Sequence, residues 1–136
     1  MADLAANKKV ARAYLELIGK GDADAVANLF ADDGAIILQS ETPLPPETKG
    51  RENIRALIGQ LTPLFPETGL KIIVDEMTAE EDRVAIMAHG DAIHASGKPY
   101  RNKYHFLLTF RNGKIVKSYE YMDSLLMTKV FFGDAK

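Results

Sequence analysis

The stretch YRNKYHFLLTFRNGKIVKSYEYMD, from Tyr100 to Asp123, decides how this chain folds. Its centre, Asn112-Gly113, is the strongest short-range signal for a two-residue β-hairpin turn, because both central residues of a type I′ turn need positive φ. Strand-forming Tyr, Phe, Val and Ile residues flank the turn on both sides. The stretch is therefore predicted to form two long antiparallel strands.

A two-residue turn also sets which side chains of the two strands lie opposite each other. Counting outward from the turn pairs Phe106 with Tyr119 on one face and His105 with Glu120 on the other. Directly opposed side chains lie within contact distance, so the count predicts a His105–Glu120 pair. A single β-bulge between the two strands would change this pairing.

Helices are predicted before this hairpin. Apolar residues at helical spacing indicate helices at about 3–20, 23–31 and 51–62. Gly21 is a helix stop and Asp22 an N-cap, and together they separate the first two helices.

Between the helices and the hairpin, short segments are predicted as strands and turns. The Asp-Asp-Gly sequence at 32–34 is predicted as a turn, followed by a buried strand at 35–38 and a proline-rich loop at 40–50. Further strands are expected at 70–77 and about 83–95. Helices followed by a meander of antiparallel strands are typical of an α+β architecture.

Length and composition restrict the class of protein. A chain of 136 residues suits a single compact domain, which we expect to span 1–136. The net charge of -2 gives no electrostatic basis for binding nucleic acid or an anionic membrane. The chain has no cysteine, which excludes disulfides and zinc–thiolate sites. The polar first ten residues lack the apolar core of a signal peptide, so a cytoplasmic location is expected.

Histidines near the end of the strand at 83–95 were considered as metal ligands. His89 and Asp91 share one face of that strand, whereas His94 points to the opposite face. A metal is therefore not expected. The sequence also has no nucleotide-binding glycine loop, and no cofactor is expected.

The hairpin register also predicts a pocket and an interface. A second two-residue turn at Ser96-Gly97 would place the small side chain of Ala88 beside His105. Small residues on this face leave space above Glu120, and helices over a curved sheet would close that space. The opposite face is aromatic and is predicted to pack against a second copy in a homodimer. Its residues are Phe106, Phe110, Tyr119 and Tyr121.

Nearly the whole chain resembles the nuclear transport factor two-like superfamily. ARAYLELIGKGDADAVANLFADDGAI, from Ala11, is similar to the opening of ketosteroid isomerases and SnoaL-like polyketide cyclases. KGRENIRALI, from Lys49, looks like the family's third helix, and the Tyr100–Asp123 stretch resembles the end of SnoaL-like and phenazine-biosynthesis proteins. The resemblance implies a cystatin-like cone, in which a curved antiparallel sheet and three N-terminal helices enclose a pocket. It indicates the fold more strongly than the activity, because the superfamily hosts enzymes and non-enzymes.

The resemblance also implies roles for particular residues. Tyr14 falls where ketosteroid isomerases carry an oxyanion-hole tyrosine, but Leu38 and His105 stand where they carry the catalytic base and a second oxyanion donor. Steroid isomerisation is therefore not expected. Glu120 falls where phenazine-biosynthesis relatives carry a pocket glutamate, and either Glu120 or Asp123 matches the acid/base of SnoaL-like cyclases. Asp123 is equally a candidate N-cap for a final helical turn.

Taken together, the sequence predicts a small-molecule enzyme that uses acid/base chemistry without a cofactor. It would isomerise or cyclise an apolar carbonyl compound, with Glu120 moving the proton, His105 orienting or protonating, and Tyr14 donating to the developing oxyanion. The expected ligand contacts are Tyr14, Ala88, Ser118 and Met122. The alternative is a non-catalytic ligand-binding or dimerisation module on the same fold.

Overall fold

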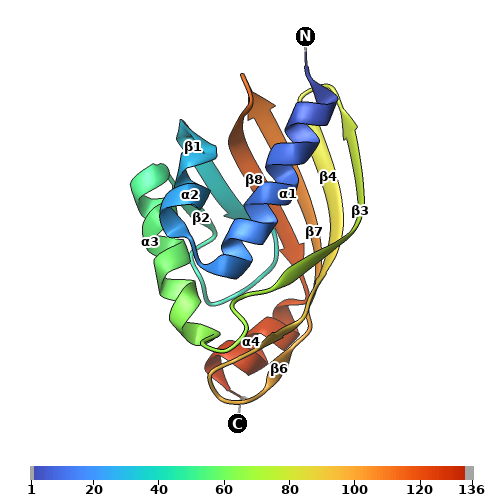
Figure 1. The fold of residues 1–136 in the computed structure, drawn as a ribbon. Helices are drawn as coiled ribbons and strands as arrows, with labels where there is room; N and C mark the ends of the chain where they lie inside the picture. The colour runs from blue at the N-terminus through green and yellow to red at the C-terminus, as the bar shows by residue number, and fades with distance from the viewer. Residues whose placement is uncertain (1, 134–136) are drawn as a thin grey trace.

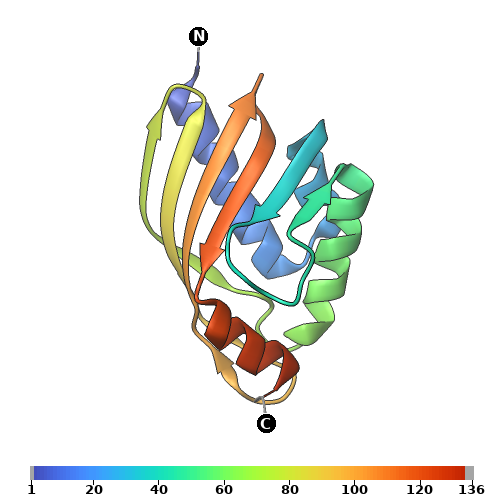
Figure 2. The same ribbon diagram turned by 180° about the vertical axis from the view of Figure 1, so that it is seen from behind.

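A computed structural model of the protein describes residues 2–133. A strongly curved sheet of six strands wraps around helix α1 (Leu4–Lys20) and tapers toward helix α4 (Ser124–Phe132), as Figure 1 shows. Helices α2 (Ala23–Asn28) and α3 (Arg51–Leu61) lie at the other side of the concave face. Among residues 2–133, no helix covers the convex side of β7 and β8 (Figure 2). Within the described residues, no helix has the length and apolar character needed to cross a membrane.

The strands of this sheet follow the order β2-β1-β8-β7-β4-β3. They are β1 (Phe30–Leu38), β2 (Glu47–Lys49), β3 (Ile72–Glu80), β4 (Arg83–Gly90), β7 (Lys103–Arg111) and β8 (Lys114–Met122). A separate two-stranded ribbon and a short 3-10 turn complete the fold: β5 (Ala92–Ile93), β6 (Pro99–Tyr100) and η1 (Thr62–Leu64). The predicted α+β class is confirmed. Because β1 and β8 run parallel while the other neighbours run antiparallel, the sheet is mixed.

The first helix ends at the glycine predicted to stop it, and an aspartate caps its start. The Asp3 side chain accepts a hydrogen bond from the Ala6 backbone N–H, and Gly21 ends α1 with φ of 72°. Tyr14 and Ile18 lie on the face of α1 that is buried against the sheet. The helix thus carries Tyr14 into the interior of the cone.

A β-bulge near the turn makes the hairpin register differ from the predicted one. Phe110 pairs with Ile115 as counted from the turn, but its neighbour Thr109 pairs with Lys117. Val116 is therefore an extra residue in β8. Since successive side chains alternate between faces, one extra residue turns the rest of the strand over.

The predicted His105–Glu120 pair is consequently wrong. Glu120 pairs with Phe106, whose side chain points into the cone and is only 2% exposed. His105 pairs with Tyr121, and both are exposed on the convex face.

The predicted aromatic interface is wrong for the same reason. Phe106 and Phe110 belong to the buried core beneath the helices, whereas Tyr119 and Tyr121 lie on the other side of the sheet. The side of β7 that carries Tyr and Phe is the more apolar side, so it is the side that folding removes from water.

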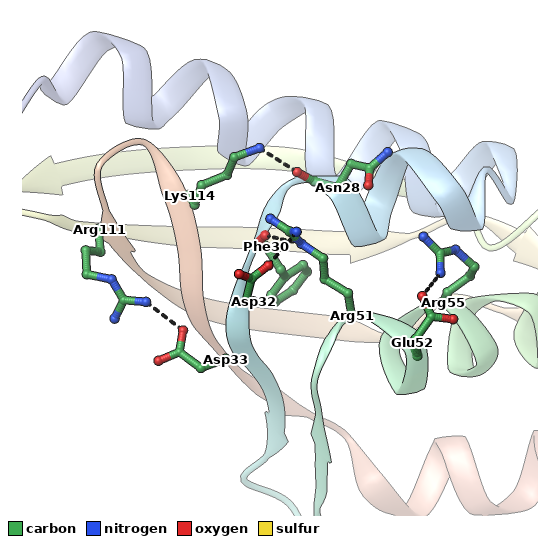
Figure 3. Close-up of polar contacts among 9 residues, drawn as sticks. All are labelled: Asn28, Phe30, Asp32, Asp33, Arg51, Glu52, Arg55, Arg111 and Lys114. Atoms are coloured by element: carbon green, nitrogen blue, oxygen red, sulfur yellow. Dashed lines mark hydrogen bonds and ion pairs between the residues drawn. The ribbon is translucent and has the colours of Figure 1, made fainter.

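The segment Asp32-Asp33-Gly34 continues β1 and does not form the predicted turn. The exposed Asp32 and Asp33 side chains contact Arg51 and Arg111, each at 2.6 Å (Figure 3). The pairing of β1 with β8 is irregular at this point, so the segment stays extended with an altered register. Correspondingly, α2 ends at Asn28 and not at 31.

The turn before β3 presses the backbone of Gly69 against the end of α1, and this contact predicts a large mutational effect. Gly69 has φ of 69°, and a Cβ atom there would lie 1.9 Å from the Gly19 carbonyl oxygen. Gly97 has φ of 87° but no atom within 4 Å of such a Cβ. We expect Gly97→Ala to cost about 1 kcal/mol of backbone strain and Gly69→Ala at least about 3 kcal/mol.

Denaturant unfolding of the two variants measures this difference directly. Equal losses of unfolding free energy in Gly69→Ala and Gly97→Ala would contradict the close contact between Gly69 and α1.

Candidate functional site

A cavity of about 380 Å³ lies between the concave face of the sheet and the helices. Its volume is within the range of small-molecule sites, roughly 300–1,000 Å³. Its apolar lining comes from six secondary-structure elements and the loop between β1 and β2: Ile18, Ile36, Leu38, Leu44, Leu57, Leu61, Phe106, Met122 and Phe131. The polar side chains of Thr48, Asn53 and Gln60 also line it, the last two exposed on α3 at the rim. The cavity therefore suits a mainly apolar molecule.

Three oxygen-bearing side chains form a cluster at the wall of this cavity. The Tyr14 hydroxyl lies 3.0 Å from Ser118 Oγ and 3.0 Å from Glu120 Oε2. Ser118 Oγ lies 3.1 Å from the same carboxylate oxygen. One oxygen of Glu120 is thus bonded by both hydroxyls, while no described residue forms a hydrogen bond to Oε1. Because Glu120 lines the cavity, Oε1 is the atom that a ligand would meet.

The surroundings of Glu120 change its affinity for protons. Burial raises the pKa of Glu120 from 4.5 to about 7, and hydrogen bonds from Tyr14 and Ser118 oppose the rise. Burial likewise raises the pKa of Tyr14 well above 10, so its hydroxyl stays protonated and can donate. At neutral pH both forms of Glu120 are populated, which is what a group that takes up and releases protons requires.

Of the three predicted acid/base residues, only Glu120 lies in the cavity. His105 is exposed on the convex face and takes no part in this site. The Asp123 side chain caps α4 by accepting a hydrogen bond from the Leu126 N–H at 3.1 Å. Of the two roles predicted for Asp123, acid/base and N-cap, the structure shows the N-cap.

Of the four predicted ligand contacts, two line the cavity and two do not. Tyr14 and Met122 line the cavity. Ser118 is fully buried behind it and contacts Tyr14 and Glu120. Ala88 is buried in the core and pairs with Tyr104, so it does not lie beside His105 as the predicted register required.

Two further tyrosines of the lining were absent from the predicted site. Tyr100 and Tyr104 both line the cavity, and the fully buried Asn102 donates to the Tyr100 hydroxyl at 2.8 Å. The sequence pattern does place all three on one face with Phe106. The predicted register, which has no bulge, places that face at an interface, and the extra residue at Val116 brings it into the cavity wall together with Glu120.

The residues considered as metal ligands do not converge. His89 contacts Asp75 at 2.8 Å, and Asp91 lies 3.7 Å from Arg101. The described part of the chain has no group of three or more His, Cys, Asp or Glu residues that could hold a metal ion.

The raised pKa of Glu120 predicts how stability depends on pH. A carboxyl group with a higher pKa in the folded than in the unfolded state binds more protons when folded, and so favours folding at low pH. Stability should fall as the pH rises from 4.5 to about 7. The Glu120 contribution to this fall is up to about 3 kcal/mol, at about 1.4 kcal/mol per pKa unit.

The side chain introduced by Glu120→Gln cannot ionise, so this variant should not lose the Glu120 contribution to stability as the pH rises. It should therefore be more stable than the unaltered protein at about pH 8. Glu16→Gln, at an exposed position on α1, is the matched control and should keep the pH dependence of the unaltered protein. Denaturant titrations at about pH 5 and pH 8 measure both. The same pH dependence in all three proteins would show that the pKa of Glu120 is not raised.

Comparison with known proteins agrees with this geometry. A comparison with curated proteins finds no match. Among solved structures, a provisionally assigned isomerase from Bacillus subtilis superposes with a TM-score of 0.85 at 18% identity, covering 98% of each chain. Bal32a from a soil-derived mobile gene cassette gives 0.79 at 20% identity, covering 96% of this chain and 98% of the other.

A provisionally assigned SnoaL-like polyketide cyclase from Jannaschia sp. CCS1 gives a TM-score of 0.74 at 18% identity, covering 97% of this chain and 95% of the other. At such identities the superpositions establish the fold alone. The family model of the SnoaL-like domain matches residues 11–118, which include most of α1, most of the sheet and most of the cavity wall, but not Glu120. The chain therefore belongs to the SnoaL-like domain family, on the nuclear transport factor two-like fold.

Proposed function

We propose that the protein is a small-molecule enzyme in which Glu120 catalyses proton transfer on an apolar carbonyl compound without a cofactor. The observation that carries the proposal is the state of Glu120. Its Oε2 is held by two hydroxyls, its Oε1 is free toward an apolar cavity, and its pKa is raised to about 7. A carboxylate held in this way can act as a base and then, once protonated, as an acid.

The chemistry is an isomerisation or an aldol-type cyclisation. In the first step Glu120 takes a proton from the carbon next to the ligand carbonyl, and the electron pair of the C–H bond moves to the carbonyl oxygen as an enolate. In an isomerisation the ligand is a β,γ-unsaturated ketone, so the anion is a dienolate, and Glu120 returns the proton to its γ-carbon as the double bond moves into conjugation. In a cyclisation the enolate carbon forms a bond to a second carbonyl carbon, and the proton goes to the oxygen of that carbonyl. The apolar walls would keep water from quenching the enolate.

The names of the similar structures are consistent with this class. An isomerase and a polyketide cyclase are provisional assignments of other proteins at 18% identity, so they support the class by analogy. The alternative is a non-catalytic ligand-binding module. It is favoured by Leu38, because an apolar side chain lines the cavity where the resemblance to ketosteroid isomerases expects a base.

Exchange of α-protons tests the proposed chemistry without knowledge of the natural substrate. The probe is 2-tetralone, a small apolar ketone, and the measurement is loss of its α-proton NMR signals in D₂O. The protein should accelerate exchange, and the rate should rise through about pH 7 as Glu120 loses its proton. Glu120→Gln should still bind the probe but lower the rate by about 100-fold or more.

Glu16→Gln controls for removal of a carboxylate outside the cavity and should exchange at the unaltered rate. Binding of 2-tetralone with no exchange above the buffer rate would decide for the non-catalytic module.

We also propose that a second copy of the chain covers the convex face. Met87 and Tyr121 are 50% and 47% exposed there, on either side of His105. An apolar surface of this kind is often an interface. This surface, formed by Met87, His105 and Tyr121, has a basic flank at Lys117 on β8 and an acidic flank at Glu76 on β3. A two-fold axis parallel to the strands would set each basic flank against the partner's acidic flank.

Sedimentation at micromolar concentration tests this proposal. We expect a dimer for the unaltered protein and a monomer for Met87→Glu, because two-fold symmetry would bury the new charge twice. Lys8→Glu, exposed on α1, is the control and should remain dimeric. A monomeric unaltered protein would contradict the proposal.

A further inference from the structure

The hydroxyl proton of Tyr14 is already committed within the protein. A phenol has one proton to donate, and the acceptors within reach are Glu120 Oε2 and Ser118 Oγ, each at 3.0 Å. Tyr14 is fully buried, so no water competes for this proton from the solvent side. Tyr14 therefore holds the carboxylate in place and has no second proton for the oxygen of a ligand.

A different pair of tyrosines does have a proton to offer. Asn102 is fully buried and all of its bonding groups are in use: Nδ2 donates to Tyr100 Oη and to the Asp123 carbonyl, and Oδ1 accepts from the Lys103 and Asp123 N–H groups. These four bonds fix which end of the amide faces Tyr100. The Tyr100 oxygen is therefore an acceptor toward Asn102, and its own proton remains available.

Tyr104 extends this arrangement toward Glu120. It lies on β7 two residues from Phe106, which pairs directly with Glu120. Diagonal neighbours on one face of a sheet are about 7–8 Å apart, within reach of aromatic side chains. Tyr104 is buried at 7% exposure and lines the cavity, and its hydroxyl is hydrogen-bonded to that of Tyr100. Whichever way the two phenols bond to each other, the pair holds two protons and can give one of them to a group in the cavity.

We propose that Tyr100 and Tyr104, and not Tyr14, donate the hydrogen bond to the carbonyl oxygen of the ligand, with Asn102 as the positioning residue. This inference rests on the proposed function of Glu120. The ligand would lie across the inner face of β7 and β8, with its α-carbon at Glu120 Oε1 and its oxygen at the tyrosine pair. When Glu120 takes the α-proton, negative charge develops on the carbonyl oxygen of the ligand. That oxygen would then lie next to two neutral hydroxyl donors.

Charge in the lining narrows the class of ligand. Lys49 is the one Lys, Arg or His residue in the described lining, and it is exposed on the edge strand β2. Its neighbour in the ladder is Ala35, which places the Lys49 side chain away from the inward-facing Ile36. An anionic head group in the interior would meet Glu120 and no cation. The structure therefore fits a neutral ketone or enone and not a carboxylic acid.

The burial of the two phenols keeps them in the donating state. Burial raises the pKa of Tyr100 and raises that of Tyr104 well above 10, and the charge of Glu120 adds to both increases. The carboxylate of Glu120 is therefore close enough to both hydroxyls for its charge to affect their pKa values. Neither phenol would ionise at any pH where Glu120 is active.

A pair of matched probes separates hydrogen bonding from shape. The probes are 2-acetylnaphthalene and 2-ethylnaphthalene, which have nearly the same shape and differ in the carbonyl oxygen. Their dissociation constants would be measured for the unaltered protein, for Tyr100→Phe/Tyr104→Phe and for the single variant Tyr104→Phe. Tyr14→Phe tests the competing donor, and Tyr119→Phe, on the convex face, controls for loss of a phenol elsewhere.

We expect the double variant to lose about tenfold in its preference for the ketone over the hydrocarbon. Hydrocarbon affinity should be unchanged, which also shows that the cavity has stayed intact. Tyr14→Phe and Tyr119→Phe should keep the preference. If the double variant does not fold, a several-fold loss in Tyr104→Phe gives the same evidence.

Two results would overturn the inference. One is an equal loss of affinity for both probes in the tyrosine variants, which would show that the two tyrosines contribute by packing and not by hydrogen bonding. The other is loss of ketone preference in Tyr14→Phe alone. Either could occur while Glu120 still exchanges the α-protons of 2-tetralone, so the inference can fail without the proposed function. Failure of the unaltered protein to bind either probe would overturn both.

Discussion

The extra residue at Val116 determines which side of β8 faces the interior of the cone. Without it, Glu120 would lie on the convex face next to His105. With it, Ser118, Glu120 and Met122 point inward, and Lys117 and Tyr121 point outward. The bulge lies close to the hairpin turn, so almost the whole strand is affected by a single insertion. The composition of the cavity wall is thus a consequence of one local irregularity in the ladder.

That irregularity brings a carboxylate into an apolar cavity, where two opposing effects act on it. Removal from water disfavours the ionised form of Glu120, and the hydroxyls of Tyr14 and Ser118 favour it. Desolvation is the larger effect, so the pKa ends near neutrality and not near the value of an exposed glutamate. The long-range contact from α1 to β8 through Tyr14 is therefore both a packing contact and the means by which the acid is held.

The narrow end of the cone depends on aromatic packing. Phe65, Tyr100 and Phe131 come from three distant parts of the chain, and their ring centroids lie 5.3–5.7 Å apart. Contacts at these distances are typical of stabilising aromatic pairs. Because Phe131 belongs to α4, the C-terminal helix closes the cavity at this end. The hydroxyl of Tyr100 sits where this cluster meets the polar Asn102, which gives an apolar wall one fixed donor.

The sequence by itself determined most of the helices and strands and the fold class, because caps, turn residues and apolar periodicity act over a few neighbouring positions. Asp3, Gly21 and Asn112-Gly113 each set a local backbone conformation that no distant contact changes. It also identified Tyr14 and Glu120 as candidate site residues. The face of each strand, in contrast, depends on an extra residue in the pairing of two strands, which is a property of the ladder and not of any single position. Only the tertiary structure therefore decided that His105 lies outside, that Glu120 meets Tyr14 and Ser118, and that Tyr100 and Tyr104 face the cavity.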